Sequence, residues 1–306
     1  MSVELTVGLP VFNGARTLRE TLDSLMVQTF DAFELFVSDN ASTDATPDIL
    51  AEYAARDARI RIVRQPRNRG AIANLHYLLE HARTPLFTWF AADDVCAPTF
   101  LERTRGALVA HPGAIIAASD VCTTDERGTP RRVHEQLDTV GATLAQRINR
   151  HLATYGWYAT YGVGRRERML AFGPLEMRFG TDVIRTAEWI LSGDVVRVPE
   201  PLFLFRERSG GKDAATYAAL LEPDGPRAST RPHCHLLSGI GEVARRYLAD
   251  PADAKEALDV AARTVAFEND VMLREVAREC GVDADMLDAR GRLRLVQAQL
   301  ERGGEA

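Results

Sequence analysis

Short apolar runs alternate with stretches of helical spacing over the first 120 residues of the chain. The runs predict strands at residues 5–9, 33–37, 60–63, 86–90 and 114–118. The stretches between them predict helices at residues 17–27, 44–55 and 74–81. Strands and helices in alternation imply crossover connections between parallel strands. The expected fold class is therefore α/β, with a mostly parallel central sheet flanked by helices.

The hydrophobic pattern becomes looser after about residue 120, beginning with the polar stretch TTDERGTPRRVHEQ. Helical patterns follow at residues 144–152, 167–171 and 182–191, and short strand patterns at 195–198 and 202–205. From residue 235 the pattern is helical almost to the end. These residues predict a C-terminal helical appendix that could pack on the core or contact another copy of the chain.

The composition narrows the class of protein. A hydrophobic content of 46% and a charged content of 26% are typical of a soluble globular protein. The net charge of -6 argues against a nucleic-acid partner, although it leaves room for a local site for an anionic small molecule. The four cysteines are scattered without a CxxC pair, which argues against zinc and disulfide frameworks and for reduced thiols.

Two further absences in the sequence bear on location. The opening MSVELTVGLPVF lacks the basic and apolar regions of a signal peptide. No apolar stretch approaches the ~18–20 residues of a membrane span. A cytoplasmic protein is expected.

Polar residues follow four of the predicted strands. The segments are GLPVFNG (8–14), VSDNASTDAT (37–46), RQPRNRG (64–70) and the pair Asp93–Asp94. In open α/β sheets ligands bind beyond the carboxyl ends of the strands, so these segments would share one edge. Taken singly, Asp39 reads as a turn or cap residue, and the aspartate pair as solvent-facing. The first segment lacks GxGxxG, which weakens a dinucleotide-binding interpretation.

As a set, in this order and spacing, the four segments resemble the inverting family-two glycosyltransferases of GT-A fold, which use nucleotide-diphosphate sugars. The resemblance extends over residues ~4–210 and is more specific in its first half. It implies a GT-A domain at 1–210, with a nucleotide-sugar half at 1–120 and an acceptor half at 121–210. Residues 211–306 would form a loop and the helical extension.

The resemblance also implies roles for individual residues. Asp39 should bind the nucleotide base, and Asp93 should hold Mn²⁺ or Mg²⁺ at the diphosphate, with Asp94 beside it. Carboxylates suit these oxygen-seeking cations. The other expected nucleotide-sugar contacts are Pro10, Phe12, Asn13, Asn40, Asn68, Gly70, Ala92 and Arg206. The family commonly reads Asp-Ala-Asp-Asp at the metal motif, whereas this chain reads Ala91-Ala92-Asp93-Asp94. The carboxylate that often touches the ribose is therefore missing.

The resemblance also implies a catalytic base ~80–100 residues after the metal motif, at the start of a helix. Asp182, in AFGPLEMRFGTDVIRTAEWIL, fits this position, where the family often has Glu-Asp. The simpler interpretation is a helix N-terminal aspartate favoured by the dipole. Glu176 and Glu188 are weaker candidates. A loop at residues 209–212 could act as a lid.

The function implied is inverting transfer of a sugar from a nucleotide-diphosphate sugar, with UDP or dTDP favoured, to an acceptor hydroxyl by metal-assisted single displacement. Saccharide or lipid-linked acceptors in bacterial surface polysaccharide or glycoconjugate assembly are expected, with peripheral contact at the inner membrane face left open. One alternative is a degenerate GT-A scaffold that binds nucleotide sugar without turnover. A sugar nucleotidyltransferase would need a glycine-rich loop after the first strand, and a processive synthase would need transmembrane helices. The sequence shows neither feature, which argues against both classes.

Overall fold

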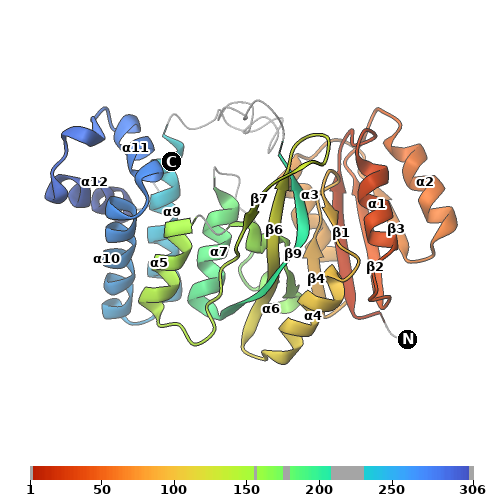
Figure 1. Ribbon diagram of the computed structural model, residues 1–306, viewed down its shortest axis with the longest axis horizontal. Helices are drawn as coiled ribbons and strands as arrows, with labels where there is room; N and C mark the ends of the chain where they lie inside the picture. The colour runs from red at the N-terminus through yellow and green to blue at the C-terminus, as the bar shows by residue number, and fades with distance from the viewer. Residues whose placement is uncertain (1–2, 155–156, 175–179, 208–230, 303–306) are drawn as a thin grey trace. The chain divides into compact units, whose positions relative to one another are not determined.

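The computed structural model describes residues 3–154, 157–174, 180–207 and 231–302 (Figure 1). The chain divides into two units, the first formed by 1–136, 158–175 and 196–225, and the second by 137–157, 176–195 and 226–306. The units do not follow the division expected at residue 210. Residues 137–157 and 176–195, which were assigned to the acceptor half, group with the C-terminal helices. The functional halves remain a prediction.

The described residues of the first unit are organised around one mixed sheet of nine strands. Its order is β3-β2-β1-β4-β8-β6-β9-β5, with β7 paired to β6. The strands are β1 (Leu5–Val11), β2 (Phe33–Asp39), β3 (Ile60–Arg64), β4 (Leu86–Trp89), β5 (Val95–Cys96), β6 (Ala114–Thr124), β7 (Pro130–His134), β8 (Val163–Arg165) and β9 (Asp194–Arg206). The pairs β1–β2, β2–β3 and β1–β4 are parallel, whereas β4–β8, β6–β8, β6–β7 and β5–β9 are antiparallel.

Helices cover both faces of this sheet because the strands are apolar on both sides. The helices around it are α1 (Leu18–Met26), α2 (Thr46–Arg56), α3 (Ala71–His81), α4 (Phe100–Ala110) and α6 (Arg166–Leu170). Leu5, Val7 and Leu9 of β1 share a core with α1, α2 and α4. On the opposite face a Cβ at Gly8 would lie 2.5 Å from the Phe87 ring and 3.2 Å from Leu78 of α3. Only glycine therefore lets α3 and Phe87 approach β1 this closely.

The predicted elements of the first half are confirmed, with bounds shifted by at most three residues except at the end of β6. The helix α4 and the short strand β5 were not predicted. The largest differences come later in the chain. The polar stretch at 123–136, for which no element was predicted, contains the strand β7, which pairs with β6 as a hairpin, and β6 itself runs on to Thr124. The two short strands expected at 195–198 and 202–205 are one strand, β9, which continues through Pro199 and Pro201. Polar residues in an exposed arm give no apolar alternation, so the pattern could not predict β7.

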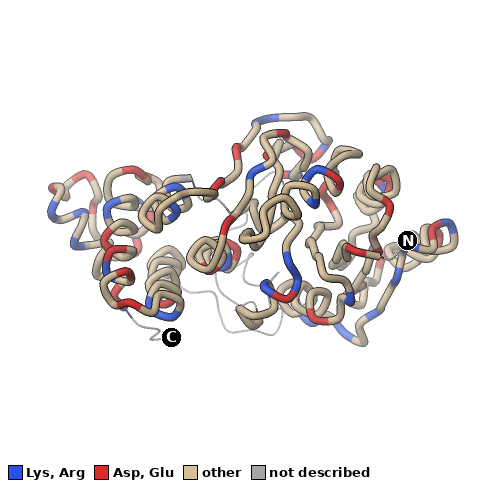
Figure 2. Tube along the Cα trace, turned by 90° about the horizontal axis from the view of Figure 1, so that it is seen from below, with Lys and Arg blue, Asp and Glu red and all other residues tan. Residues whose placement is uncertain are grey.

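The second unit is helical in its described residues. Its elements are α5 (Leu144–Thr154), α7 (Thr181–Ser192), α9 (Pro232–Tyr247), α10 (Pro251–Phe267), α11 (Asp270–Glu279), η2 (Ala284–Met286) and α12 (Ala289–Glu301); a short 3-10 turn, η1 (Trp157–Tyr161), links the two units. Asn269 ends the long helical pattern between α10 and α11, because its side chain caps Met272 N at 3.0 Å and donates to Leu152 O at 2.7 Å. Acidic and basic residues are interspersed over the C-terminal helices (Figure 2). None of the described helices has the length and apolar composition needed to span a membrane.

His151 is buried within this helical core and makes its stability depend on pH. Its Nε2–H donates to Val183 O at 2.9 Å, and Nδ1 has no hydrogen-bond partner among the described residues. A proton on Nδ1 would place a charge in the core, so burial lowers the pKa of His151 from 6.5 to about 4.

We expect the free energy of unfolding to fall as the pH drops from 6.5 to 4. In this window the unfolded chain binds a proton at residue 151 and the folded chain does not, so the stabilisation present above pH 6.5 is progressively lost. The loss would reach about 3 kcal/mol, since one pKa unit corresponds to ~1.4 kcal/mol. Urea unfolding of wild type and His151→Gln at pH 7 and 4.5 measures it. Equal pH dependence in the two proteins would contradict this account.

Candidate functional site

The carboxyl ends of four parallel strands meet at one edge of the sheet in the first unit. Parallel register aligns Val11 of β1 with Asp39 of β2, and Asp39 with Arg64 of β3. Backbone bonds extend this alignment past the strands: Asn40 N donates to Val11 O at 2.8 Å, and Phe90 N donates to Gly8 O at 3.0 Å. The four polar segments predicted to share an edge therefore do so.

The loop after β1 is fastened to the loop after β2 through Asn13. Its backbone adopts a left-handed conformation with φ of 51°. Asn13 N donates to Ser42 Oγ at 2.9 Å, and Asn13 Oδ1 accepts from Thr43 N at 2.8 Å. Ser42 and Thr43 thus hold the loop after β1 and do not cap α2. Pro10 is partly buried and Phe12 is 45% exposed, so the Phe12 ring is available to a ligand.

Asp39 is the buried carboxylate of this edge, with 1% of its surface exposed. Its Oδ1 accepts from Ser42 N at 2.9 Å, which is the turn role expected from sequence. Its Oδ2 is buried and accepts no hydrogen bond from the described residues, although Arg64 Nε lies 3.5 Å away. Because a buried carboxylate oxygen is costly to leave without a donor, this atom is suited to a ligand N–H.

Asn40 shapes the neighbouring loop between β3 and α3. Its Nδ2 donates to Asn68 Oδ1 at 2.8 Å and to Gly70 O at 3.1 Å, and its Oδ1 accepts from Arg69 N at 2.9 Å. Asn68 Oδ1 also accepts from Gly70 N at 2.9 Å. Gly70 has φ of 81°, which favours glycine there. These residues thus form a rigid floor, and their polar groups mostly serve the loop itself.

The two aspartates after β4 have different surroundings. Asp94 is 1% exposed, and its Oδ1 accepts from Arg206 N at 2.9 Å. Asp93 is partly exposed. The carbonyls on either side of Asp93 are fixed from α1, since Thr17 Oγ1 donates to Ala92 O at 3.0 Å and Thr21 Oγ1 donates to Asp94 O at 2.8 Å. Asp93 is therefore the more accessible carboxylate, and hydrogen bonds from Thr17 and Thr21 fix the backbone on either side of it.

Arg206 lies at the end of β9, where its backbone N–H donates to Asp94. Its guanidinium is mostly buried and forms a 2.5 Å ion pair with Glu20 Oε2 of α1. Its Nη1 contacts Glu126 O at 3.4 Å. The Arg206 side chain thus ties β9 to α1, while its backbone N–H holds Asp94.

Sequence reasoning overlooked Thr17, Thr21 and Arg64. The two threonines lie one helical turn apart on the face of α1 that meets the metal-motif loop. That spacing was visible, but a buried threonine in an amphipathic helix gives no sign of which carbonyl it will contact. Arg64 was the first residue of the polar segment 64–70 and had no role assigned, and only the β2–β3 register brings it to Asp39.

Asp182 lies in the first turn of α7, in the helical unit. Its Oδ1 accepts from Val183 N at 2.9 Å. Burial by the surrounding protein raises the pKa of Asp182 above the usual 3.8, and the hydrogen bonds from Val183 N and from its own N–H offset this only in part. A raised pKa makes an aspartate a better proton acceptor near neutral pH.

The weaker candidates for the base differ from Asp182. Glu188 is buried and forms a 3.0 Å ion pair with Arg185, so its charge already has a structural partner. Glu176 and the loop at 209–212 lie outside the described residues. Two aromatic residues of η1 are engaged in packing. Tyr158 packs on Phe205 with ring centroids 5.3 Å apart, and Tyr161 on Phe203 with centroids 5.0 Å apart.

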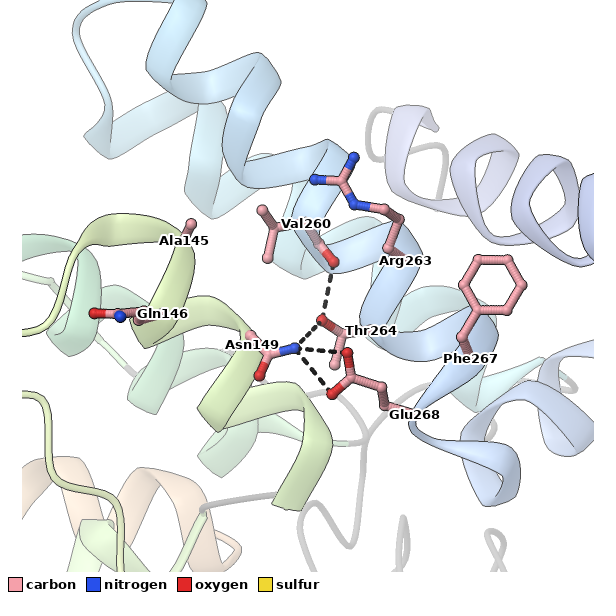
Figure 3. Close-up of a pocket in the computed structure, with 8 residues that line it drawn as sticks. All are labelled: Ala145, Gln146, Asn149, Val260, Arg263, Thr264, Phe267 and Glu268. Carbon is pink, nitrogen blue, oxygen red and sulfur yellow. Dashed lines mark hydrogen bonds between the residues drawn. The ribbon is translucent and has the colours of Figure 1, made fainter.

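A groove of about 420 Å³ lies between α5 and α10, within the helical unit (Figure 3). Asn149 Nδ2 crosses it to Thr264 Oγ1 at 3.1 Å and to both oxygens of Glu268 at 3.0 Å. The eight residues that line it include none of the predicted site residues. Its central polar groups are engaged in holding two helices together, so the strand-end edge remains the better candidate site.

Comparison with known proteins identifies the family of the chain. Residues 6–167 match the sequence model of Glycosyl transferase family 2, which is just over half of the chain. The Bacillus subtilis (strain 168) protein EpsE, named as a glycosyltransferase, is 30% identical over 126 residues. That match covers 41% of this chain and 45% of EpsE, so the chain spans less than half of this relative.

Solved structures show the same fold at low sequence identity. The crystal structure of S. aureus TarS 1–349 in complex with UDP-GlcNAc has a TM-score of 0.66 and 16% identity, covering 97% of this chain and 90% of that one. The mannosyltransferase PcManGT from Pyrobaculum calidifontis, in complex with GDP-Man and Mn²⁺, has a TM-score of 0.57 and 19% identity, covering 98% and 85%. The predicted GT-A type fold with C-terminal helices is thereby confirmed.

Proposed function

The chain belongs to glycosyl transferase family 2, and from this membership we propose that it transfers a sugar from a nucleoside-diphosphate sugar to an acceptor hydroxyl with inversion at the anomeric carbon. The proposal rests on the arrangement of carboxylates at the sheet edge where the parallel strands of the first unit end. There the buried Asp39 and the partly exposed Asp93 are brought by neighbouring loops to the carboxyl ends of parallel strands.

Asp39 is proposed to recognise the nucleotide base. Its buried Oδ2 accepts no hydrogen bond from the described residues, and the ring N–H of uracil or thymine supplies the donor it lacks. UDP is favoured over dTDP and GDP as the leaving group. The UDP-GlcNAc bound to the similar structure TarS supports this choice, while the GDP-Man bound to PcManGT makes GDP the main competitor.

Asp93 is proposed to hold a divalent cation, Mn²⁺ or Mg²⁺, with Asp94 beside it. Carboxylate oxygens are ligands that both ions prefer, so the donor chemistry fits. When bound, such an ion neutralises negative charge that develops on the diphosphate as it leaves. Since Ala91 stands where the family commonly has a carboxylate, contact with the ribose must come from other groups. Asp94 also anchors Arg206 N, so we assign the larger share of cation binding to Asp93.

Asp182 is proposed to act as the catalytic base. In a single in-line displacement the acceptor oxygen attacks the anomeric carbon as the bond to the diphosphate breaks. Asp182 would take the proton that the acceptor hydroxyl loses. Its raised pKa supports this role, because an ordinary aspartate is a weak base at neutral pH.

The acceptor is proposed to be a saccharide or a lipid-linked glycan of a bacterial surface polysaccharide or glycoconjugate. The mixed charge of the C-terminal helices is compatible with contact with an anionic membrane surface or with a second copy of the chain. Both contacts are proposals about the helical unit. A catalytically degenerate scaffold that binds nucleotide sugar remains the competing function, because Ala91 and Thr181 depart from the family pattern.

Two measurements test the proposal. The first is calorimetric titration with UDP, dTDP and GDP, with and without Mn²⁺, and the second is an assay of donor turnover. We expect Mn²⁺-dependent binding of UDP and slow release of UDP from a UDP-sugar, accelerated by saccharide acceptors. Binding without turnover across a panel of sugars and acceptors would favour the scaffold. Absence of binding to all three nucleotides would contradict both functions.

Asp39→Asn is expected to weaken UDP binding by about 10- to 100-fold, equivalent to ~1.4–2.8 kcal/mol. An asparagine oriented to keep Oδ1 on Ser42 N presents its NH₂ to the uracil N–H, so two donors face each other. Calorimetry with UDP measures the change. Asp48→Asn, at an exposed position in the first turn of α2, is the matched control and should bind like wild type. Unchanged affinity in Asp39→Asn would remove Asp39 from the base pocket.

A further inference from the structure

Two of the four cysteines are close together in the helical unit, although they are 46 positions apart in sequence. Cys234 lies in the first turn of α9, and Cys280 is the C-cap residue of α11. Their Sγ atoms are 3.7 Å apart. A disulfide has an S–S bond of ~2.05 Å, so closure requires the sulfurs to approach by only about 1.7 Å.

The backbone at both sulfurs is held in position by Glu279. Its Oε2 accepts from Cys234 N at 2.9 Å, and its Oε1 accepts from His233 N at 3.1 Å and contacts His233 Nδ1 at 2.7 Å. Because Glu279 directly precedes Cys280, it caps the start of α9 from the end of α11. The two cysteines are thus kept adjacent by an interaction that does not involve sulfur.

Arg231 gives the two sulfurs different surroundings. Its Nη2 lies 2.8 Å from Cys280 Sγ and 3.6 Å from Cys234 Sγ. A guanidinium beside a cysteine favours the thiolate, which is the reactive form. Cys280 is also partly exposed, whereas Cys234 is 3% exposed, and burial raises the pKa of the Cys234 thiol to about 12.

Cys96 is an example of a buried cysteine with no charged neighbour in hydrogen-bonding contact. It is the second residue of β5 and is 4% exposed, and burial raises its pKa to about 12. Its hydrogen-bonding neighbours are Ser24 and Gln28, which are neutral. Two adjacent thiols could be simple core packing, but a guanidinium in contact with a partly exposed sulfur is not needed for packing.

We propose that Cys234 and Cys280 form a reversible oxidation site, in which peroxide converts the pair to a disulfide that fastens the first turn of α9 to the end of α11. The sequence had favoured reduced, unpaired thiols, because the two positions are far apart along the chain.

The chemistry proceeds in two steps with hydrogen peroxide as the oxidant. The Cys280 thiolate attacks one peroxide oxygen, an S–O bond forms, the O–O bond breaks, and hydroxide leaves. Cys280 is then a sulfenic acid. The Cys234 sulfur attacks Cys280 Sγ, an S–S bond forms, and the S–O bond breaks. The departing hydroxide takes the Cys234 proton and leaves as water. Overall, two thiols lose two electrons and one peroxide becomes two waters.

The test is peroxide treatment of the full-length protein, followed by thiol alkylation, intact mass measurement and peptide mapping. We expect alkylatable thiols to fall from four to two, with a Cys234–Cys280 peptide that dithiothreitol reverses. Cys234→Ser should instead accumulate sulfenic acid at Cys280, which dimedone traps. Cys122→Ser is the control and should still form the cross-link. Circular dichroism would verify that each variant is folded.

Two further measurements distinguish a functional oxidation site from two cysteines that are close together by chance. Arg231→Gln should slow disulfide formation about tenfold while leaving the final product unchanged. The oxidised wild type should melt roughly 5 °C higher than the reduced form, and oxidised Cys280→Ser should not. Retention of four thiols after peroxide, a cross-link that involves another cysteine, or an unchanged rate in Arg231→Gln would overturn the proposal.

Discussion

Asp182→Asn should lower the turnover number for sugar transfer by about 10²–10⁴-fold while leaving UDP affinity close to that of wild type. The variant keeps the shape of the side chain and an oxygen for Val183 N, but an amide cannot accept the acceptor's proton. Nucleotide binding is assigned to Asp39 and Asp93 in the other unit, so it should persist. Rates of UDP release with a saccharide acceptor, beside calorimetry with UDP, measure the two effects separately.

The pH profile of wild type provides an independent readout of the same residue. A base acts in its deprotonated form, so activity should fall on the acid side as pH drops through the pKa of Asp182. Because burial raises this pKa, the fall should be centred above 3.8, the usual value for aspartate. In Asp182→Asn the remaining activity should lack this acid limb.

Two variants serve as controls for Asp182. Asp253→Asn removes an exposed carboxylate from the first turn of α10, so it repeats the helix-dipole change without touching a catalytic group. Glu188→Gln removes the buried partner of Arg185 and should reduce stability more than turnover. If Asp182→Asn retained more than a tenth of wild-type turnover, or if Glu188→Gln alone abolished it, the base would have to be another residue.

Asp93→Asn should abolish the Mn²⁺ dependence of UDP binding and lower turnover by about 10²–10³-fold. Asp93 is the more accessible of the two carboxylates, and its flanking carbonyls are held by Thr17 and Thr21. Replacing it by an amide removes a negative charge from the proposed cation site with little change in shape. Titration of UDP in the presence of Mn²⁺ and of EDTA, on wild type and variant, measures the effect.

Variants of Asp94 distinguish an effect on cation binding from an effect on folding. Asp94→Asn keeps an oxygen for Arg206 N, so it should fold normally and show a smaller loss of Mn²⁺ dependence than Asp93→Asn. Asp94→Ala leaves a buried N–H without its acceptor and should lose about 1–3 kcal/mol of stability. Equal Mn²⁺ dependence in wild type and Asp93→Asn would remove Asp93 from the cation site, whatever the behaviour of Asp94.

The sequence alone determined the strand and helix order of the first half, apart from the short strand β5 and the helix α4, which the pattern of apolar and polar residues did not predict. Apolar runs and helical spacing are local signals, and crossover connections follow from their alternation. The same local signals located the four polar strand ends, because parallel strands must bring their carboxyl ends to one edge. The sequence was also enough to identify the family, since Asp39, Asn68, Gly70 and Asp93 occur in the order and spacing that the family shows.

The tertiary structure decided the features that depend on contacts between residues far apart in the sequence. It distinguished Asp93 from Asp94, because β9 brings Arg206 N to Asp94 from more than a hundred residues away. It left Asp39 Oδ2 buried without a hydrogen bond from the described residues. It also placed Cys234 and Cys280 within 3.7 Å of each other through the packing of α9 on α11. Hydrogen-bond partners, burial and the resulting pKa values are set by side chains brought together only when the chain folds, and no local pattern of apolar and polar positions encodes them.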